Sequence, residues 1–493
     1  MRRIDPTQPA LQRQPLYSVQ ATRRIEQAAQ AALPPHVLMQ RAGLAVARLA
    51  LALAPHARTI WIACGPGNNG GDGLEAAVHL QHWGKQPVVT WLGDEAAAPA
   101  DALASLARAR QAGVAFADEP LPGMTAKDLC IDALLGIGAR RPAAGRLLEC
   151  IHLLNAGPAP VLAIDVPSGL DADTGHAAVD LTAQNTLSLL TLKPGLFTAR
   201  GRDAAGQVWL DPLDCDPAAA PACAELLGRP QFTPRAHASH KGSYGDVAVL
   251  GGAPGMTGAA LLAASAALHG GAGRVFVALL DGGNLAVDKS HPELMFRHAS
   301  TLDWRSMTVV CGCGGGDVVR SVLPKVLSTA GRLVLDADAL NAVAADAALQ
   351  TLLHARAARG QATVLTPHPL EAARLLGSNT AAVQADRLAA AQQLADRHGC
   401  VAVLKGSGTV IAAPARIPAI NATGNARLAT AGTGDVLAGL IGARLATGSA
   451  AFDAACEAVF AHGLAADEWP SGKPLVASRL ACGIVTAGLA RNP

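Results

Sequence analysis

The chain has 493 residues, of which half are hydrophobic and only 3% aromatic, and its formal net charge is +2. This length is too great for one compact core and favours about two to four domains. A charge so close to zero gives no reason to expect nucleic acid or a membrane surface as a partner.

Neither the N-terminus nor the cysteines indicate export. The first residues lack the apolar core of a secretory signal, and no apolar stretch approaches the ~20 residues of a membrane span. The ten cysteines include no C-x-x-C pair, and the nearest approach to a zinc spacing is "CGC" at 311–313. Since two ligands do not make a zinc site, we expect buried free thiols in a cytoplasmic protein.

The first half of the chain alternates short apolar runs with segments of helical period. Two helices, over 17–30 and 37–53, are expected around the proline pair at 34–35. Five strands are then expected, with helical stretches between most of them, at 59–64, 87–92, 129–136, 160–169 and 185–195. This alternation predicts a parallel sheet covered by helices on both faces, a Rossmann-like three-layer sandwich.

A second α/β unit follows a joint in the sequence. Residues 211–235 hold five prolines among scattered alanines, which favours a domain boundary there. A small-residue helix is expected at 257–273, and strands at 245–252, 274–279, 307–312, 332–337, 362–367 and 401–406. We therefore expect two α/β domains, residues 1–218 and 219–493, with no visible internal repeat.

The string "GPGNNGGDG" at 65–73 follows the first strand and contains G-x-G-x-x-G, the pattern of a dinucleotide-binding loop. Asp94 lies roughly 20 residues further on, as in a hydride-carrier fingerprint. The amides of Asn68 and Asn69 and the carboxylate of Asp72 instead make a loop of directed polar groups, whose oxygens suit a hard cation. So flexible a loop costs folding entropy without returning packing, so we interpret it as functional.

This string and four later segments resemble the YjeF N-terminal family, the NAD(P)H-hydrate epimerases. The other segments are "VLMQRAG" (37–43), "IDALLGIGARRP" (131–142), "AIDVPSGLDADTG" (163–175) and "TLKPGL" (191–196). The resemblance covers roughly residues 16–212, and it implies a potassium ion at Asn69, Asp132 and Ser168. Taken alone, Asp132 and the "DVPSG" turn could instead be turn caps.

The same resemblance implies contacts to a hydrated dinucleotide. The contacting residues would be Asn68, Asn69, Gly70, Gly71, Asp72, Gly136, Ile137, Gly138, Ala139, Arg140, Arg141, Pro142 and Asp165. Arg140 and Arg141 are suitable donors to phosphates. Asp165 is the expected catalytic residue of this half, although the identity of the epimerase acid and base is left open.

The sharpest signal of the second half is "ATAGTGDVLAGLIGARLA" at 429–446. Its glycines precede an apolar helix, whose N-terminal N–H groups would form an anion site. A carboxylate at that place, Asp435, would serve as a base that takes a proton from a hydroxyl attacking phosphorus. The alternative is a capping turn without catalytic function.

"GTGD" (432–435) resembles the anion-hole motif of ribokinase-like carbohydrate kinases. A wider set of segments over roughly 228–490 resembles the ADP-dependent NAD(P)H-hydrate dehydratases; they are "HKGSYGDVAVLGG", "MTGAA", "VLDADALN", "LTPHPLEAARLLG", "VLKGSGTVI" and "NATGNARLATAGTGD". This resemblance implies nucleotide contacts at Lys405, Gly406, Ser407, Gly408, Thr409 and Gly434. It implies substrate contacts at Ala259, Gly316, His368 and Asp435, and Mg²⁺ as a cofactor. "CGCGGG" at 311–316 departs from the family's usual P-G-L-G.

Both resemblances imply one substrate, hydrated NADH or NADPH. The first domain would interconvert its R and S epimers, and the second would use ADP to return the S form to NAD(P)H, releasing AMP and phosphate. The alternative is a small-alcohol kinase, of the hydroxymethylpyrimidine or hydroxyethylthiazole type, fused to a non-catalytic Rossmann-like binding domain. We expect a homo-oligomer. The sequence leaves open its size, the NADH or NADPH preference and any channelling between sites.

Overall fold

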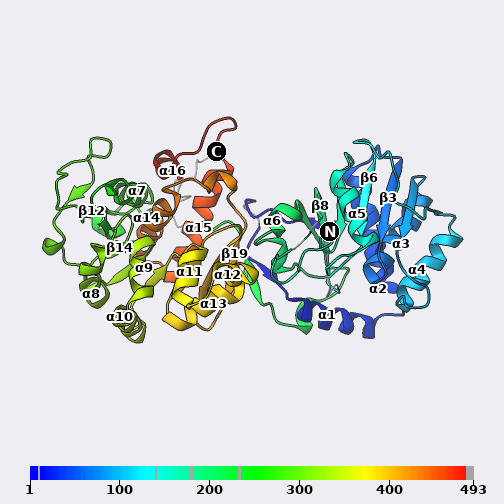
Figure 1. The fold of residues 1–493 in the computed structure, drawn as a ribbon, viewed down its shortest axis with the longest axis horizontal. Coiled ribbons are helices and arrows are strands. Elements are labelled where there is room, and N and C mark those ends of the chain that lie inside the picture. Colours follow the sequence, from blue (N-terminus) through cyan, green and yellow to red (C-terminus); the bar gives the residue numbers. More distant parts are fainter. Residues whose placement is uncertain (9–10, 139–141, 178, 180, 231–234, 485–493) are drawn as a thin grey trace. The chain divides into compact units, whose positions relative to one another are not determined.

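The computed structural model describes residues 1–8, 11–138, 142–177, 179, 181–230 and 235–484. The chain divides into two compact units (Figure 1). The first contains Met1–Asp5 and Pro15–Ala224, and the second contains Pro6–Gln14 and Glu225–Pro493. The short segment Pro6–Gln14 therefore packs with residues more than two hundred positions away, and its Arg13 lies 3.2 Å from Glu225 and 3.1 Å from Asp453.

The first unit is built on an eight-stranded sheet of order β1-β9-β8-β7-β6-β3-β4-β5. Its strands are β1 (Arg2–Arg3), β3 (Thr59–Cys64), β4 (Gln86–Trp91), β5 (Ala115–Phe116), β6 (Leu129–Ala133), β7 (Val161–Ile164), β8 (Asn185–Leu189) and β9 (Gln207–Asp211). All neighbours pair in parallel except β1 and β9. The chain runs outward from β3 to one edge and from β6 to the other, so a crevice opens between β3 and β6 at their carboxyl ends.

Helices cover both faces of this sheet. They are α1 (Val19–Ala32), α2 (Val37–Leu53), α3 (Asn68–His82), α4 (Ala100–Gln111), α5 (Arg146–Ala156) and the short α6 (Gly201–Ala204), with 3-10 turns η1 (Pro194–Leu196) and η2 (Pro217–Ala219). Alternate residues of β3 enter different cores. Ile60 and Ile62 pack with α2 and α3, whereas Trp61 and Ala63 pack with α5. This is the three-layer sandwich that the sequence predicts.

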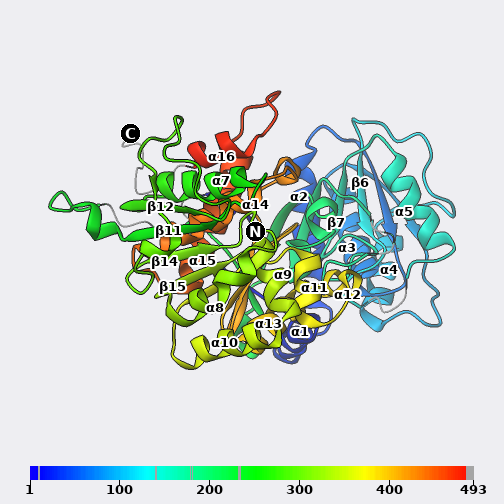
Figure 2. The same cartoon turned by 60° about the vertical axis from the view of Figure 1, so that its left-hand side comes forward.

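The second unit has an eleven-stranded sheet of order β13-β12-β11-β14-β15-β16-β17-β18-β19-β10-β2. Its strands are β2 (Gln14–Leu16), β10 (Ala224–Leu226), β11 (Asp246–Gly251), β12 (Arg274–Leu279), β13 (Met295–Phe296), β14 (Thr308–Cys311), β15 (Arg332–Leu335), β16 (Thr363–Leu365), β17 (Val401–Leu404), β18 (Thr409–Ala413) and β19 (Arg416–Asn421). Figure 2 shows β12, β11, β14 and β15 side by side. The strands from β13 to β17 pair in parallel, and β17, β18 and β19 pair antiparallel.

Helices again form two layers. They are α7 (Thr257–His269), α8 (Val319–Thr329), α9 (Ala337–Ala345), α10 (Ala347–Ala358), α11 (Pro369–Leu376), α12 (Thr380–Ala385), α13 (Arg387–His398), α14 (Thr433–Ala446), α15 (Ala451–Asp467) and α16 (Ala477–Gly483), with 3-10 turns η3 (Lys241–Tyr244), η4 (Ala299–Thr301) and η5 (Ala426–Leu428). Val334 of β15 faces the core formed with α7, α14 and α15, and its neighbours Leu333 and Leu335 face the core with α8 to α13.

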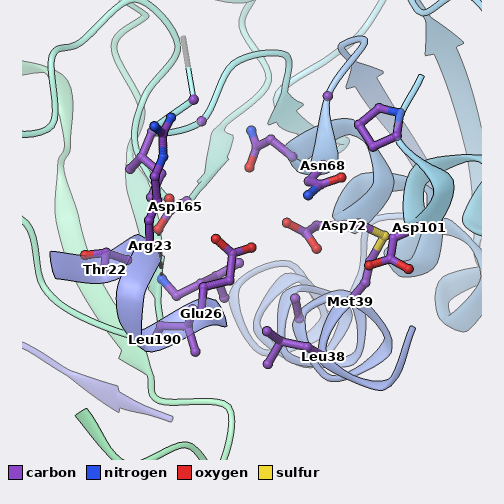
Figure 3. A pocket seen from close by; sticks show the side chains of 18 of the residues that line it. Thr22, Arg23, Glu26, Leu38, Met39, Asn68, Asp72, Asp101, Asp165 and Leu190 are labelled. Atoms are coloured by element: carbon purple, nitrogen blue, oxygen red, sulfur yellow. Dashed lines mark hydrogen bonds between the residues drawn. The ribbon is translucent and has the colours of Figure 1, made fainter. Parts of the chain in front are cut away.

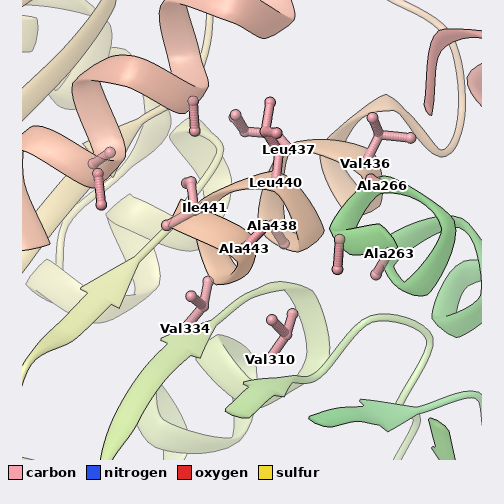
Figure 4. Packing of buried hydrophobic residues seen from close by; sticks show 14 of the residues in the cluster. Ala263, Ala266, Val310, Val334, Val436, Leu437, Ala438, Leu440, Ile441 and Ala443 are labelled. Atoms are coloured by element: carbon pink, nitrogen blue, oxygen red, sulfur yellow. The ribbon is translucent and has the colours of Figure 1, made fainter. Parts of the chain in front are cut away.

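Helix α14 lies at the centre of the first of these cores. Its Leu440 and Ile441 are fully buried, and Figure 4 shows them between α7 and strands β14 and β15. Two glycines of α14 allow the helix to pack closely against α7 and β14. A Cβ on Gly439 would lie 1.9 Å from the carbonyl oxygen of Ala263, and one on Gly442 would lie 2.4 Å from Val310. Tight packing therefore fixes the position of the α14 N-terminus.

No single helix in the described ranges is long and apolar enough to cross a membrane. The bent pair Val19–Ala32 and Val37–Leu53, with 115° between its helices, meets the length and composition criteria only when the two are taken together.

Candidate active sites of the two units

The first unit has a cavity of about 440 Å³ at the carboxyl ends of β3, β6 and β7. Figure 3 shows the acidic side chains of Glu26, Asp72 and Asp165 converging on it. Several predicted contact residues line the cavity, namely Asn68, Asn69, Asp72, Gly136, Ile137, Gly138 and Asp165. Pro142 is exposed. The predicted contacts Ala139, Arg140 and Arg141 lie outside the described residues.

The glycines of the first motif have a different role from the one expected. The sequence predicts a flexible loop up to residue 73, but α3 begins at Asn68. A Cβ on Gly70 would lie 2.0 Å from the carbonyl oxygen of Gly65, and one on Gly73 would lie 2.6 Å from Ala133. The expectation that these glycines return no packing is wrong, because they let the first turn of α3 lie against the ends of β3 and β6.

A buried hydrogen-bonded pair joins the ends of β6 and β7. The Ser168 hydroxyl donates to Oδ1 of Asp132 at 2.6 Å, and the Ser168 N–H donates to Oδ2 at 2.8 Å. Asp132 is fully buried, and burial raises its pKa to about 6 although the Ser168 hydrogen bonds oppose this. Oδ1 also accepts from the N–H of Leu134, so Asp132 caps a turn as well.

The third predicted potassium ligand, Asn69, lies in the first turn of α3. A Cβ on Gly136 would lie 3.3 Å from Asn69 Oδ1, so the amide packs on the segment that follows β6. Its Nδ2 is buried and has no hydrogen-bond partner among the described residues. A buried carboxylate, a hydroxyl and an incompletely satisfied amide form an all-oxygen donor set once the amide is turned. These residues therefore fit a hard monovalent cation.

Asp165 pairs with a lysine that the sequence analysis missed. Lys193 is fully buried, and its ammonium group donates to Oδ1 of Asp165 and to the carbonyl oxygen of Leu189. Asp165 has φ 67°, a left-handed conformation that is uncommon for aspartate and typical of functional turns. The segment "TLKPGL" contains Lys193, but only its fold places the ammonium group on Asp165.

Two further carboxylates share this cavity. Burial, followed by the charge of Asp165, raises the pKa of Glu26. Burial and the charges of Asp165, Glu26, Glu75 and Asp101 raise the pKa of Asp72 well above its ordinary value. The protonated forms of Glu26 and Asp72 are therefore favoured in this cavity, which also contains the Lys193–Asp165 pair.

In the second unit, the motif "GTGD" forms the first turn of α14. Gly432 caps the helix in the left-handed conformation at φ 87°. By helix geometry the N–H groups of Gly434 and Asp435 have no intrahelical acceptor. A Cβ on Gly434 would lie 3.3 Å from Nζ of Lys405, so a lysine ammonium stands beside this helix N-terminus. The two features together make an anion site.

A buried ionic cluster lies next to this anion site. Lys405 Nζ lies 2.7 Å from Oδ1 of Asp336, which also accepts from the Thr366 hydroxyl at 2.7 Å. Burial alone would lower the pKa of Lys405, but Asp336 and Glu371 outweigh it and raise that pKa. Asp336 belongs to the segment "VLDADALN", and the sequence analysis assigns it no role. In the structure it directly follows β15 and faces Lys405.

Asp435 faces the same cluster. Ligand atoms of Asp435, Asp336 and Cys313 all lie within 4.8 Å of one another. Burial, and then the charge of Asp336, raises the pKa of Asp435 to about 7, while a hydrogen bond from Cys313 and the charge of Lys405 oppose the rise. A carboxyl with this pKa can accept a proton near neutral pH. Cys313 belongs to the "CGCGGG" departure, and its contact with Asp435 was not foreseen.

The other predicted contacts of this half gather on neighbouring loops. The Lys405 N–H donates to the carbonyl oxygen of Pro367, which places the turn 405–409 beside His368. Gly316 has φ 52°, and its N–H donates to Asp338 at 2.8 Å. Ala259 lies in the first turn of α7 near this loop, since a Cβ on Gly314 would lie 2.9 Å from it.

His368 has a structural role in addition to any contact with substrate. Its Nδ1 accepts from the N–H groups of Leu370 and Glu371, and Glu371 accepts from the His368 N–H, which completes a capping box. The His368 side chain is nevertheless exposed at 46%, so it remains accessible from outside the fold.

Comparisons with known proteins cover both units. A family model described as YjeF-related protein N-terminus matches residues 35–195, and one described as NAD(P)H-hydrate dehydratase matches residues 247–486. The bifunctional NAD(P)H-hydrate repair enzyme Nnr of Escherichia coli is 38% identical, over 87% of this chain and 84% of that protein. The ADP-dependent (S)-NAD(P)H-hydrate dehydratase of Neisseria meningitidis is 44% identical, over 52% of this chain and 88% of its own.

A solved structure is similar to part of the chain. It is the ADP/ATP-dependent NAD(P)H-hydrate dehydratase of Bacillus subtilis, co-crystallised with ATP/Mg²⁺, which is 29% identical with a TM-score of 0.43 and covers 51% of this chain and 92% of that one.

Two α/β units with mostly parallel sheets, each with charged groups at the carboxyl ends of its strands, are typical of a two-domain α/β enzyme. The predicted fold class, Rossmann-like followed by ribokinase-like, is confirmed. With its similarity extending over most of the Escherichia coli protein, the chain belongs to the family of bifunctional NAD(P)H-hydrate repair enzymes.

We expect the loss of Lys193 alone to destabilise the first unit strongly. Replacing Lys193 by Met would leave a carboxylate without its buried partner, and such losses cost about 3–5 kcal/mol. The thermal unfolding midpoint and urea titration of K193M should show this loss, and the double variant D165N/K193M should recover part of it because Asn carries no charge. Lys127→Met, at an exposed position, is the control. Equal stability of K193M and K127M would contradict the prediction.

Proposed function

We propose that this chain repairs hydrated NADH and NADPH, with one reaction in each unit. The first unit epimerises the R and S hydrates, and the second dehydrates the S hydrate with ADP as co-substrate. The observation that carries this is family membership over both units. We assign the epimerase to residues 1–218 and the dehydratase to residues 219–493.

The dehydratase site has the groups that phosphoryl transfer needs. We assign the adenine nucleotide to the turn 405–409 and the α14 N-terminus, where Lys405 and the N–H of Gly434 would hold its phosphates. Asp435 accepts the proton of the ring hydroxyl as its oxygen attacks the terminal phosphorus of ADP, and AMP leaves. The phosphate ester then loses phosphate and a ring proton, which restores the double bond of NAD(P)H.

Substrate contacts at Ala259, Gly316, His368 and Asp435 are proposed on the same basis. Loops carrying these residues come together around the α14 N-terminus. Mg²⁺ prefers phosphate oxygens, water and one or two carboxylates. In the described site Asp336 is engaged by Lys405 and Thr366, and the thiol of Cys313 is a poor ligand for a hard cation. We therefore propose that Mg²⁺ arrives with the nucleotide phosphates.

The epimerase site is proposed in the cavity of the first unit. Asn69, Asp132 and Ser168 would hold potassium, which would supply a fixed positive charge toward the substrate. Asp165, held by Lys193, faces the cavity as the proposed catalytic carboxylate. The raised pKa values of Asp72 and Glu26 make either residue a candidate proton donor. It would act in the step that breaks and re-forms a bond at the hydroxylated ring carbon.

Family membership supports this function over the kinase alternative, because the similarity extends through both units and not only the shared "GTGD" motif. It also argues against a non-catalytic first unit. The expected homo-oligomer, the cytoplasmic location and the absence of nucleic-acid or membrane partners stay predictions.

One assay tests the function directly. The protein is incubated with mixed R and S NADH hydrates, with and without ADP, and the absorbance of reduced nicotinamide is followed. We expect full recovery of NADH from both the R and the S hydrate only when ADP is present, together with formation of AMP and phosphate. A stable phosphorylated alcohol as the product would contradict the proposal and support a kinase.

Replacing Asp435 by Asn removes the proposed base and keeps the shape of the side chain, while Gly432 still caps the helix. We expect kcat for ADP-dependent dehydration to fall by at least ~100-fold, with little change in ADP affinity and none in epimerisation. The matched control is Asp346→Asn, at the N-cap of α10. Ordinary turnover in D435N would leave Asp435 as a helix-end residue only.

The pH profile of dehydration should depend on Cys313. The base must be ionised, so kcat/KM should fall as the pH drops through about 7. The Cys313 thiol stabilises the ionised carboxylate, so C313A should raise the pKa of Asp435 and move the acidic limb to higher pH. C313S, which keeps a donor, should move it less. If the acidic limbs of the pH profiles coincide for the wild-type protein, C313A and C313S, the thiol does not act on Asp435.

Replacing Asp132 by Asn or Ala should impair epimerisation and leave dehydration of the S epimer intact. The change removes the only carboxylate of the proposed potassium set, and we expect a fall of at least about 10-fold. Rates are measured with R hydrate in potassium-rich and potassium-free buffers. Asp128→Asn, just before the same strand, is the control. An unaltered rate and potassium response in both Asp132 variants would refute the ion assignment.

A further inference from the structure

Three metal-binding side chains meet on the second unit, outside the dehydratase site. They are His269 at the end of α7, His291 in the segment between β12 and β13, and Cys482 in α16. One ligand atom of each lies within 4.8 Å of the other two. The Cys482 Sγ lies 3.7 Å from Nε2 of His291. We propose that these residues form a binding site for Zn²⁺.

The hydrogen bonds of the two imidazoles leave the correct nitrogens for a metal. Nδ1 of His291 lies 3.2 Å from a carboxylate oxygen of Asp288, and Nδ1 of His269 lies 2.9 Å from the carbonyl oxygen of Ser265. Both acceptors fix the proton on Nδ1, so each Nε2 has its lone pair available. A carboxylate or carbonyl behind the imidazole is the usual second partner of zinc-bound histidine.

The spacing and chemistry suit zinc. Zn–N bonds of about 2.0–2.1 Å and a Zn–S bond of about 2.3 Å, in tetrahedral geometry, separate neighbouring ligand atoms by roughly 3.5 Å. The observed 3.7 Å between sulfur and nitrogen is close to this value. Two imidazoles and one thiolate are a borderline-soft set, which excludes Mg²⁺ and Ca²⁺. The Ser265 hydroxyl, 3.1 Å from Nε2 of His291, lies where water or the hydroxyl would complete the shell.

The position of the site assigns it a structural role. Helix α7 has 13 residues and is therefore about 20 Å long, with its N-terminal turn beside Gly314 of the dehydratase site and His269 at the other end. A metal at His269 would tie α7 to α16 and to the segment carrying Asp288 and His291. Bound Zn²⁺ therefore would not enter the reaction but would stabilise the helix that borders it.

Binding of Co²⁺ at the proposed site can be followed by its absorption spectrum. The full-length protein is treated with a chelator and titrated with Co²⁺ under reducing conditions. We expect a thiolate-to-metal band in the near ultraviolet and tetrahedral absorption in the visible, both removed by added Zn²⁺. Cys482→Ser should abolish the thiolate band, and Cys223→Ser, at a partly buried cysteine outside the cluster, should keep it.

The dehydratase cluster also contains a cysteine, so Cys313→Ser is titrated in parallel. A thiolate band that survives C482S and disappears in C313S would overturn the proposal, as would the absence of any band in the wild-type protein. Neither result touches the proposed repair function, which is measured separately with the hydrates.

Zinc affinity is then measured by competition with a chromogenic chelator. Asp288→Asn keeps all three ligands but weakens the support of His291, and we expect a loss of about 10- to 100-fold in affinity. Zn²⁺ should also raise the thermal midpoint of the wild-type protein but not of C482S. Unchanged affinity in both D288N and C482S would overturn the site.

Discussion

The ion pair between Asp336 and Lys405 governs the electrostatics of the second unit. Asp336 stands at the end of β15 and Lys405 at the end of β17, and Thr366, after the intervening β16, donates to the same oxygen. With Asp336 only 2% exposed, an unpartnered carboxylate there would be costly. The pair also sets the charge beside Asp435, whose pKa is raised by burial and then by Asp336, while Cys313 and Lys405 oppose the rise. The proposed binding and proton transfer at this site would thus depend on one partly buried lysine.

The first unit also contains a lysine–aspartate ion pair, in a different geometry. Lys193, fully buried, holds Asp165 in a left-handed turn at the end of β7, while Glu26 and Asp72 share the cavity beyond it. Both units therefore gather several carboxyl groups near the carboxyl ends of parallel strands, and burial raises the pKa of those that the helices contribute, Glu26, Asp72 and Asp435. The two sheets have different strand orders, yet both units share this feature.

The sequence predicted the central parallel strands of both sheets, because apolar period and breakers report local structure directly. It did not predict β9 of the first sheet, the antiparallel β18 and β19 of the second, or the short edge strands. It did not predict that α3 starts at Asn68, since the need for glycine at positions 70 and 73 arises from β3 and β6, which lie elsewhere in the chain. The motif residues Asp435, Asp132 and Ser168 were identifiable because they stand in recognisable segments. Cys313, Asp336 and Lys193 were not, since their roles arise from contacts between strand ends that are far apart in sequence. His269, His291 and Cys482 have no regular spacing at all.

The segment Pro6–Gln14 alters how the two units are connected. It packs with the second unit, whereas the residues on either side belong to the first, so the polypeptide passes from one unit to the other at 5/6, 14/15 and 224/225. A cut at 224/225 would leave the first fragment carrying a piece of the second unit's own fold, and it would separate Arg13 from its partners Glu225 and Asp453. A half-length gene that encoded only one of the two units would therefore need to replace or discard those nine residues.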